Sequence, residues 1–280
     1  MIGRLLSLWV CAGVILLGAG GTAADVVSLE GVPAYYPLYG GCGPTAAGMI
    51  IGYWDAHGYP DLITAGDGTN SWTTNQQAVK DVIASPEHFN DYWGYGTGDR
   101  PTPPAHHADN CIADFMLASR DPRVDGISDA NKQDNGLRGY AHHVGYTDAT
   151  SDWLWYASLW DLFVAEIDAG RPMEFFVDVT ADGQAEANHF VTAIGYDDTP
   201  GAHRYACHNG YDNLVHWYDF APPASGQTYG IETGTWFDPV PEPATLALLG
   251  MGIAFGLIKN RADRRSTRRL NHLSKGESHA

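Results

Sequence analysis

The chain has 280 residues, of which 44% are hydrophobic, and its formal net charge is −17 at pH 7. This length and apolar fraction are enough for one sizeable globular domain or two small ones. The acidic balance argues against binding to nucleic acid or to anionic lipid surfaces, because those ligands are themselves negatively charged.

The first 24 residues predict a secretory signal peptide. Arg4 precedes the apolar run 5–17, and small residues at 21–24 provide a cleavage site. We therefore expect segment 1–24 to be removed on export.

Cys42 is the most informative residue of the segment that follows. It stands between Gly41 and Gly43, whose missing side chains leave room for a substrate backbone. The apolar run after it predicts a buried helix over 43–56, with Pro44 tolerated in the first turn. The thiol is thus expected at a helix N-terminus, where the helix dipole favours the nucleophilic thiolate. A structural cysteine at the start of a core helix is the alternative interpretation.

The mature chain divides into a helical first part and a strand-rich second part. Apolar periodicity predicts helices over 43–56, 75–84, 109–119, 136–145 and 156–169. Strands are predicted over 173–180, 189–197, 203–208, 214–218 and 229–236. Helices followed by strands indicate an α+β domain, which we place at 25–238.

A base and an orienting group for a nucleophilic cysteine lie in the strand-rich part. His189 stands at the start of one predicted strand, and Asn209 stands at the end of the next. Antiparallel pairing of the two strands would bring them side by side. Both follow Cys42 in the order, and at roughly the 130–150-residue scale, of papain-type enzymes.

Three motifs together resemble a papain-like cysteine peptidase, closest to the branch that processes the double-glycine leaders of bacteriocins. They are Gly-Cys-Gly-Pro-Thr-Ala-Ala at Cys42, Asn-His-Phe-Val-Thr-Ala-Ile-Gly-Tyr-Asp at His189, and Asn209 before a Gly-aromatic-Asp run. The resemblance covers about residues 30–237. It implies a papain-like fold, with a helical lobe followed by an antiparallel β lobe, and a peptide or protein substrate without a cofactor. It also implies Cys42 as nucleophile, His189 as base and Asn209 as orienting residue, with Asp212 as an alternative third member.

The sequence departs from this family at the oxyanion hole. Papain-like enzymes usually carry a glutamine donor shortly before the cysteine, and residues 32–39 contain none. The Cys42 backbone N–H remains as a donor, and Tyr36, Gln76 and Gln77 are candidate further donors. Loss of one side-chain donor costs on the order of 10²–10³ in turnover. Two functions therefore stay open: an exported amide-bond hydrolase, and a non-catalytic papain-like module that binds the envelope or the biofilm matrix.

Residues 239–280 form a three-part segment at the C-terminus. Pro-Glu-Pro at 241–243 precedes the apolar run 244–258, and a basic cluster follows. The pattern resembles the PEP-CTERM sorting signal, which implies export, membrane anchorage through 244–258, processing by an exosortase and retention in the cell envelope or exopolysaccharide. An ordinary C-terminal anchor is the alternative. Between the two ends, residues 25–258 hold 8 basic and 31 acidic residues, so the exported domain is strongly acidic.

The remaining cysteines and histidines predict no metal site. After signal removal the chain keeps Cys42, Cys111 and Cys207, an odd number that indicates at least one free thiol. A disulfide between Cys111 and Cys207 and two reduced core thiols are both open. The pairs His106–His107 and His142–His143 place adjacent side chains on different sides of an element, which does not suit chelation. The oxygen-rich loop 121–134 lacks the spacing of a calcium-binding EF-hand.

Overall fold

The computed structural model describes residues 25–35, 40–63, 77–93, 106–120, 125–181, 187–224 and 226–239. The predicted signal peptide and the apolar and basic parts of the C-terminal segment lie outside these ranges. No helix within the described ranges is long and apolar enough to cross a membrane.

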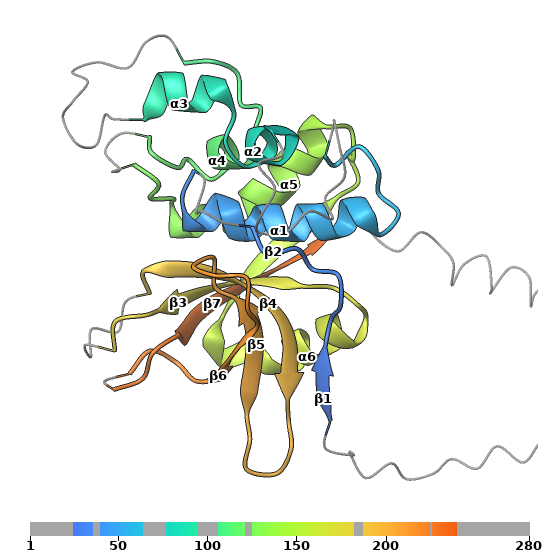
Figure 1. Ribbon diagram of the computed structural model, residues 1–280, viewed down its shortest axis with the longest axis vertical. Coiled ribbons are helices and arrows are strands. Elements are labelled where there is room, and N and C mark those ends of the chain that lie inside the picture. Colours follow the sequence, from blue (N-terminus) through green and yellow to red (C-terminus); the bar gives the residue numbers. More distant parts are fainter. Residues whose placement is uncertain are drawn as a thin grey trace, which may run out of the picture.

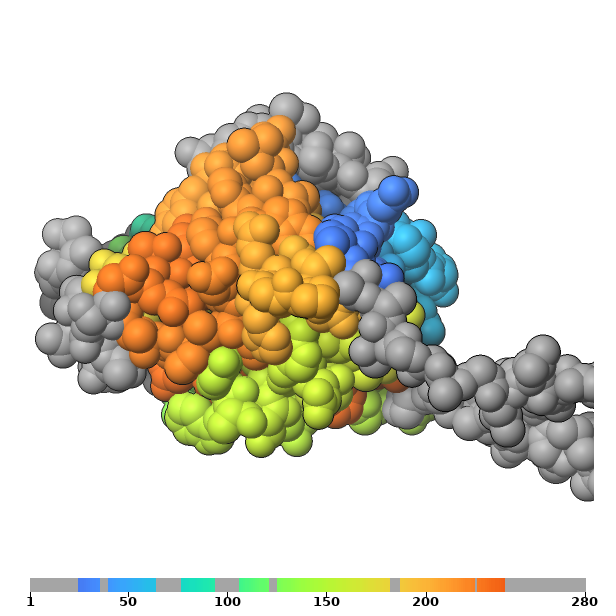
Figure 2. Space-filling model, turned by 90° about the horizontal axis from the view of Figure 1, so that it is seen from below, coloured from blue at the N-terminus to red at the C-terminus, as the bar shows by residue number. Residues whose placement is uncertain are grey.

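The first layer of the fold is helical and lies on one face of a sheet (Figure 1). Its helices are α1 (Cys42–Ala56), α2 (Gln77–Ile83), α3 (Pro86–Tyr92), α4 (Ile112–Phe115) and α5 (Gln133–His143). The sixth helix, α6 (Trp160–Asp168), lies on the other side of the sheet (Figure 1). Figure 2 shows the face on which the segment around α6 and the later strands reach the surface.

The second layer is an antiparallel sheet of seven described strands. They are β1 (Val26–Ser28), β2 (Thr150–Trp155), β3 (Met173–Asp178), β4 (His189–Asp197), β5 (Arg204–His208), β6 (His216–Asp219) and β7 (Gly230–Asp238). The strand order is β2-β7-β3-β4-β5-β6, and β1 pairs with β4. The α+β prediction, with a helical part followed by an antiparallel sheet, is therefore confirmed.

Alternation along β3 explains how both faces of the sheet are covered. Phe175 and Val177 belong to the core under α6, which includes Phe163. The intervening Phe176 packs against the core of the helical layer. Successive side chains of a strand point to opposite faces, so one strand serves two cores.

Side-chain hydrogen bonds join the helical layer to the sheet. The Thr192 hydroxyl on β4 donates to the carbonyl oxygen of Ala46 in α1, at 2.9 Å. The Thr235 hydroxyl on β7 donates to the amide oxygen of Gln133 in α5, at 2.7 Å. The first of these bonds holds α1 against β4, the two elements that carry the candidate nucleophile and base.

The observed elements differ from the predicted ones mainly in the short segments. The predicted helix 109–119 is reduced to α4, because Leu117 and Ser119 adopt left-handed φ values of 55° and 57° that end the helix. The strands β1 and β2 and the helix α3 were not predicted. These three elements have three, six and seven residues, too few to give a clear periodicity.

Candidate active site

Cys42 is the first residue of α1, and the local backbone requires the glycine before it. Gly41 has a left-handed φ of 107°, and its carbonyl oxygen accepts hydrogen bonds from the Thr45 N–H and hydroxyl. A Cβ at Gly41 would lie 2.0 Å from the carbonyl oxygen of Gly126. Both the φ angle and the close approach favour glycine at this position.

His189 is the first residue of β4 and is nearly fully buried. Its Nε2 lies 2.8 Å from the backbone carbonyl oxygen of Asn209. A carbonyl oxygen only accepts, so Nε2 carries the proton and Nδ1 is left unprotonated in the neutral ring. Burial lowers the pKa of His189, and the bond to Asn209 only partly opposes this. The imidazole is therefore neutral at pH 7 and offers Nδ1 as a base.

Antiparallel pairing of β4 with β5 brings Asn209 to His189. The contact is made by the Asn209 backbone, while its side chain shapes the following loop. The side-chain oxygen accepts from the Tyr211 N–H at 2.9 Å, and the amide hydrogen-bonds to the hydroxyls of Tyr218 and Tyr229. The side chain thus acts on His189 only through the loop that it holds.

Asp212, the alternative third member, is directed toward another histidine. Its carboxylate accepts from His216 Nε2 at 2.7 Å and from the Leu214 N–H at 2.9 Å. The structure does not bring Asp212 into contact with His189.

Tyr211 covers the base. Its ring stacks on the His189 ring, with centroids 4.6 Å apart and an interplanar angle of 14°. The Tyr211 hydroxyl lies 3.4 Å from Nδ1, at the outer limit of a hydrogen bond. Half of the Tyr211 side chain is exposed, so this residue separates Nδ1 from solvent.

The Cys42 thiol lies beside the start of β4, in a site that does not favour its charged form. Burial raises the pKa of Cys42, and the nearby Glu174 raises it further. The backbone N–H groups of Phe190, Gly43 and Cys42 face the sulfur and lower the pKa in part. Desolvation therefore opposes the stabilisation of the thiolate expected from the helix dipole, and it outweighs the favourable N–H groups at the helix start.

The resting Cys42–His189 pair is therefore neutral. The side chains of Cys42 and His189, which both lie in the described part of the chain, are not hydrogen-bonded to each other. Such bonds often tighten only when substrate is bound, so this geometry is compatible with a nucleophile and its base.

Glu174 is a feature of the site that sequence reasoning missed. It lies on β3, opposite Thr192 of β4 and Thr235 of β7, and is fully buried. Neither carboxyl oxygen has a hydrogen-bond partner among the described residues. Burial raises the pKa of Glu174 well above its ordinary value, which favours the protonated form of the group. The available signal was a single acid enclosed by apolar residues near the start of the predicted strand 173–180.

The oxyanion-hole candidates from the sequence are only partly described. Tyr36 and Gln76 lie outside the described residues, and Gln77 is exposed and donates to Asp81. Ser128 is a candidate that the sequence did not indicate. Its buried hydroxyl has no partner among the described residues and lies 2.9 Å from where a Cβ on Gly43 would stand.

All three described cysteines are free. Cys111 belongs to the helical core and Cys207 to the core under α6, so the two are reduced thiols in different cores. The sequence left open a Cys111–Cys207 disulfide or two reduced thiols, and the structure has the two reduced thiols.

Comparison with known proteins identifies the class to which this fold and site belong. Residues 29–224 match the Peptidase_C39 like family, and residues 239–265 match the PEP-CTERM protein-sorting motif. Because the first match spans well over half of the sequence, the chain belongs to the Peptidase_C39 like family. Both resemblances predicted from the sequence are confirmed.

One solved structure illustrates the similarity at low identity. The chain is similar to the active wild-type interpain A cysteine protease of Prevotella intermedia, with a TM-score of 0.46 and 15% sequence identity. The alignment covers 77% of this chain and 95% of that one. None of the curated proteins compared with this chain matches it.

Proposed function

We propose that this chain is an exported cysteine peptidase that hydrolyses amide bonds of peptides or proteins. The observation that carries the proposal is the position of Cys42 at the start of α1, beside β4. His189, the first residue of β4, donates its Nε2 proton to the Asn209 carbonyl oxygen. This leaves Nδ1 as the basic atom of a Cys–His pair, in a chain of the Peptidase_C39 like family.

The proposed reaction starts from the neutral pair. Once Tyr211 has moved aside, Nδ1 of His189 takes the thiol proton as the Cys42 sulfur attacks the substrate carbonyl carbon. The Cys42 N–H, with Ser128 as a second donor, stabilises the oxyanion. The tetrahedral intermediate collapses to a thioester, and Nδ1 gives its proton to the leaving amine. Water activated by Nδ1 then hydrolyses the thioester and restores the thiol.

The sorting motif supports a location at the cell envelope. A PEP-CTERM motif implies export and processing by an exosortase, with transient anchorage through residues 244–258. Substrates would then be peptides or proteins that meet the enzyme outside the cytoplasm. Retention in the exopolysaccharide is part of this proposal.

Mass spectrometry of peptide termini tests the activity directly. The mature protein, Cys42→Ala and the matched control Cys207→Ala are each incubated with a complex peptide library. We expect new termini with the wild type and with the control, whose cysteine is equally free but lies in the core under α6. Undiminished cleavage by Cys42→Ala would refute the proposal.

A second candidate function is a non-catalytic module that binds the envelope or the biofilm matrix. The neutral resting pair and the Tyr211 ring over His189 favour it, because both oppose a nucleophile that is active at rest. It predicts saturable binding to extracted matrix polysaccharide that survives Cys42→Ala. Loss of that binding in Cys42→Ala alone would contradict it.

A further inference from the structure

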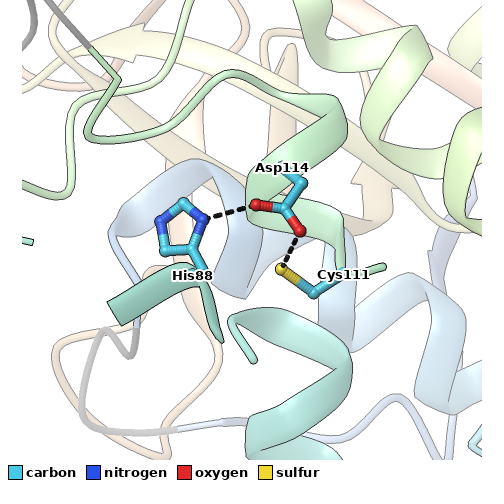
Figure 3. A group of neighbouring side chains, drawn as sticks. All are labelled: His88, Cys111 and Asp114. Atoms are coloured by element: carbon cyan, nitrogen blue, oxygen red, sulfur yellow. Dashed lines mark hydrogen bonds and ion pairs between the residues drawn. The ribbon is translucent and has the colours of Figure 1, made fainter. Parts of the chain in front are cut away.

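A second polar cluster lies in the helical layer and centres on Asp114 of α4. The Asp114 side chain is fully buried, and four side chains lie against its carboxylate, among them Arg120, whose Nη2 is 3.5 Å from Oδ1. Oδ1 lies 2.8 Å from His88 Nδ1, while Oδ2 lies 3.1 Å from the Cys111 sulfur and 3.0 Å from His107 Nε2. Figure 3 shows the imidazole of His88 and the thiol of Cys111 converging on the carboxylate.

The donor atoms of this cluster match those that zinc prefers. His88, Cys111 and Asp114 offer one nitrogen, one sulfur and one oxygen, all within 4.8 Å of one another. Zinc binds such ligands at about 2.0–2.3 Å in tetrahedral geometry, so neighbouring ligand atoms lie roughly 3–4 Å apart. The cluster therefore has nearly the dimensions of a metal cage, and small side-chain shifts would complete it.

His107 supplies a fourth nitrogen with the support typical of a metal ligand. Its Nε2 faces Asp114, and its Nδ1 lies 2.7 Å from Asp91 Oδ2. The same Asp91 oxygen also accepts from the His107 N–H at 2.9 Å, which fixes the ring. A carboxylate behind the second ring nitrogen is the usual way in which proteins orient metal-bound histidines.

The surroundings of the Cys111 sulfur also suit a metal-bound thiolate. The backbone N–H groups of Ser85 and Asp114 face the sulfur and favour its charged form. A metal bound at this sulfur would displace the thiol proton to solvent, as metal binding to cysteine does.

Hydrogen bonds do not satisfy every buried polar atom of this cluster. His88 is fully buried, yet its Nε2 has no partner among the described residues. A buried ring held through one nitrogen only is costly in a network that serves folding alone. The ring is thus held at Nδ1 alone, and Nδ1 is the atom that would bind a metal.

We propose that His88, Cys111 and Asp114 bind a divalent metal ion of the zinc type, with His107 as the fourth ligand. The site joins α3, which carries His88, to α4 and the residues before it, and so stabilises two short helices. It is independent of the proposed peptidase chemistry. Sequence reasoning dismissed the His106–His107 pair as a chelate. The two rings indeed diverge, with His106 bonded to Tyr92, but His107 meets ligands from other segments.

The test uses the full mature protein with zinc or cobalt ions as the only probes. After dialysis against metal-free buffer, we expect about one zinc ion per chain by elemental analysis. Cobalt loading should give a thiolate-to-metal absorption band, and a chelator should lower the thermal midpoint. Cys207→Ala and Cys42→Ala, the two other cysteines, should retain all three properties.

Ligand variants decide the assignment. Cys111→Ser should lose the cobalt–thiolate band, and Asp114→Asn should bind zinc at least tenfold more weakly. If either variant fails to fold, His107→Gln, at a ring that is partly exposed, should still weaken zinc binding at least tenfold. The proposal would be overturned if the folded wild type held no stoichiometric zinc. It would also be overturned if His107→Gln kept its zinc affinity and Cys111→Ser kept the wild-type cobalt band.

Discussion

The Nε2 proton of His189 is held by the backbone carbonyl oxygen of Asn209, 2.8 Å away. The carbonyl is present whatever the side chain at position 209, so orientation of the base is built into the backbone. The Asn209 side chain contributes to the position of His189 only indirectly, through the hydrogen bond that it accepts from the Tyr211 N–H. The amide side chain of Asn209 therefore does not itself orient the histidine.

The first prediction concerns Asn209→Ala. Because the carbonyl remains, we expect the rate of Cys42 alkylation at pH 7 to fall less than about tenfold, against about 10²–10⁴ for loss of the base in His189→Ala. The two variants are compared under the same conditions, with circular dichroism as a check of folding. An Asn209→Ala defect as severe as that of His189→Ala would show that the side chain dominates.

The second prediction concerns Tyr211. Because its ring covers Nδ1 of His189, Tyr211→Ala should speed Cys42 alkylation several-fold. Tyr211→Phe keeps the stacked ring and should remain near the wild-type rate. Equal rates in the alanine and phenylalanine variants would argue against a covering role.

The third prediction concerns Ser128 as an oxyanion donor. Ser128→Ala should lower kcat for peptide cleavage by about 10²-fold with little change in KM, since the donor acts in the transition state. Ser158→Ala, at an exposed position, serves as the matched control. A wild-type kcat in Ser128→Ala would exclude this donor.

The fourth prediction concerns stability and the buried Glu174. Because its pKa is raised in the folded state, Glu174 keeps its proton there at pH values at which the unfolded chain has already lost it. This begins as the pH rises above the ordinary pKa of a glutamate. The wild-type free energy of unfolding should therefore decrease relative to Glu174→Gln as pH rises, by up to about 1.4 kcal/mol per pH unit. Urea unfolding of both proteins at pH 5 and pH 8 measures this, and a pH-independent difference would contradict it.

The elements that carry the candidate nucleophile and base could be predicted because their sequence patterns are local. The apolar run after Cys42 and the alternation after His189 predicted α1 and β4 within a residue of their observed bounds. The approach of Asn209 to His189 followed from the pairing of two consecutive strands. Which atom of Asn209 makes the contact depends on the loop conformation, and no sequence pattern indicates it.

The less predictable features arise where residues distant in the sequence meet. Glu174 is fully buried without a hydrogen-bond partner among the described residues, and Ser128 approaches Gly43 from a distant part of the sequence. Similarly, His88 and Asp114 are 26 residues apart, on two short helices without a strong periodic signal. The raised pKa of Cys42 could not be predicted, because the sequence indicates a helix start but not the burial around it.

The alkylation of Cys42 by iodoacetamide as a function of pH tests the central claim most directly, because it needs no substrate. The lowered pKa of His189 leaves Nδ1 unprotonated from below about pH 6.5, so it accepts the thiol proton throughout the neutral range. We expect the wild type to be labelled about 10²–10⁴-fold faster than His189→Ala at pH 7, with an acid limb whose midpoint lies below about 6.5. In His189→Ala, labelling should rise only as the buried thiol itself ionises, above its ordinary range. Superimposed profiles for the two proteins, both rising only at alkaline pH, would contradict the assignment of His189 as the base of Cys42.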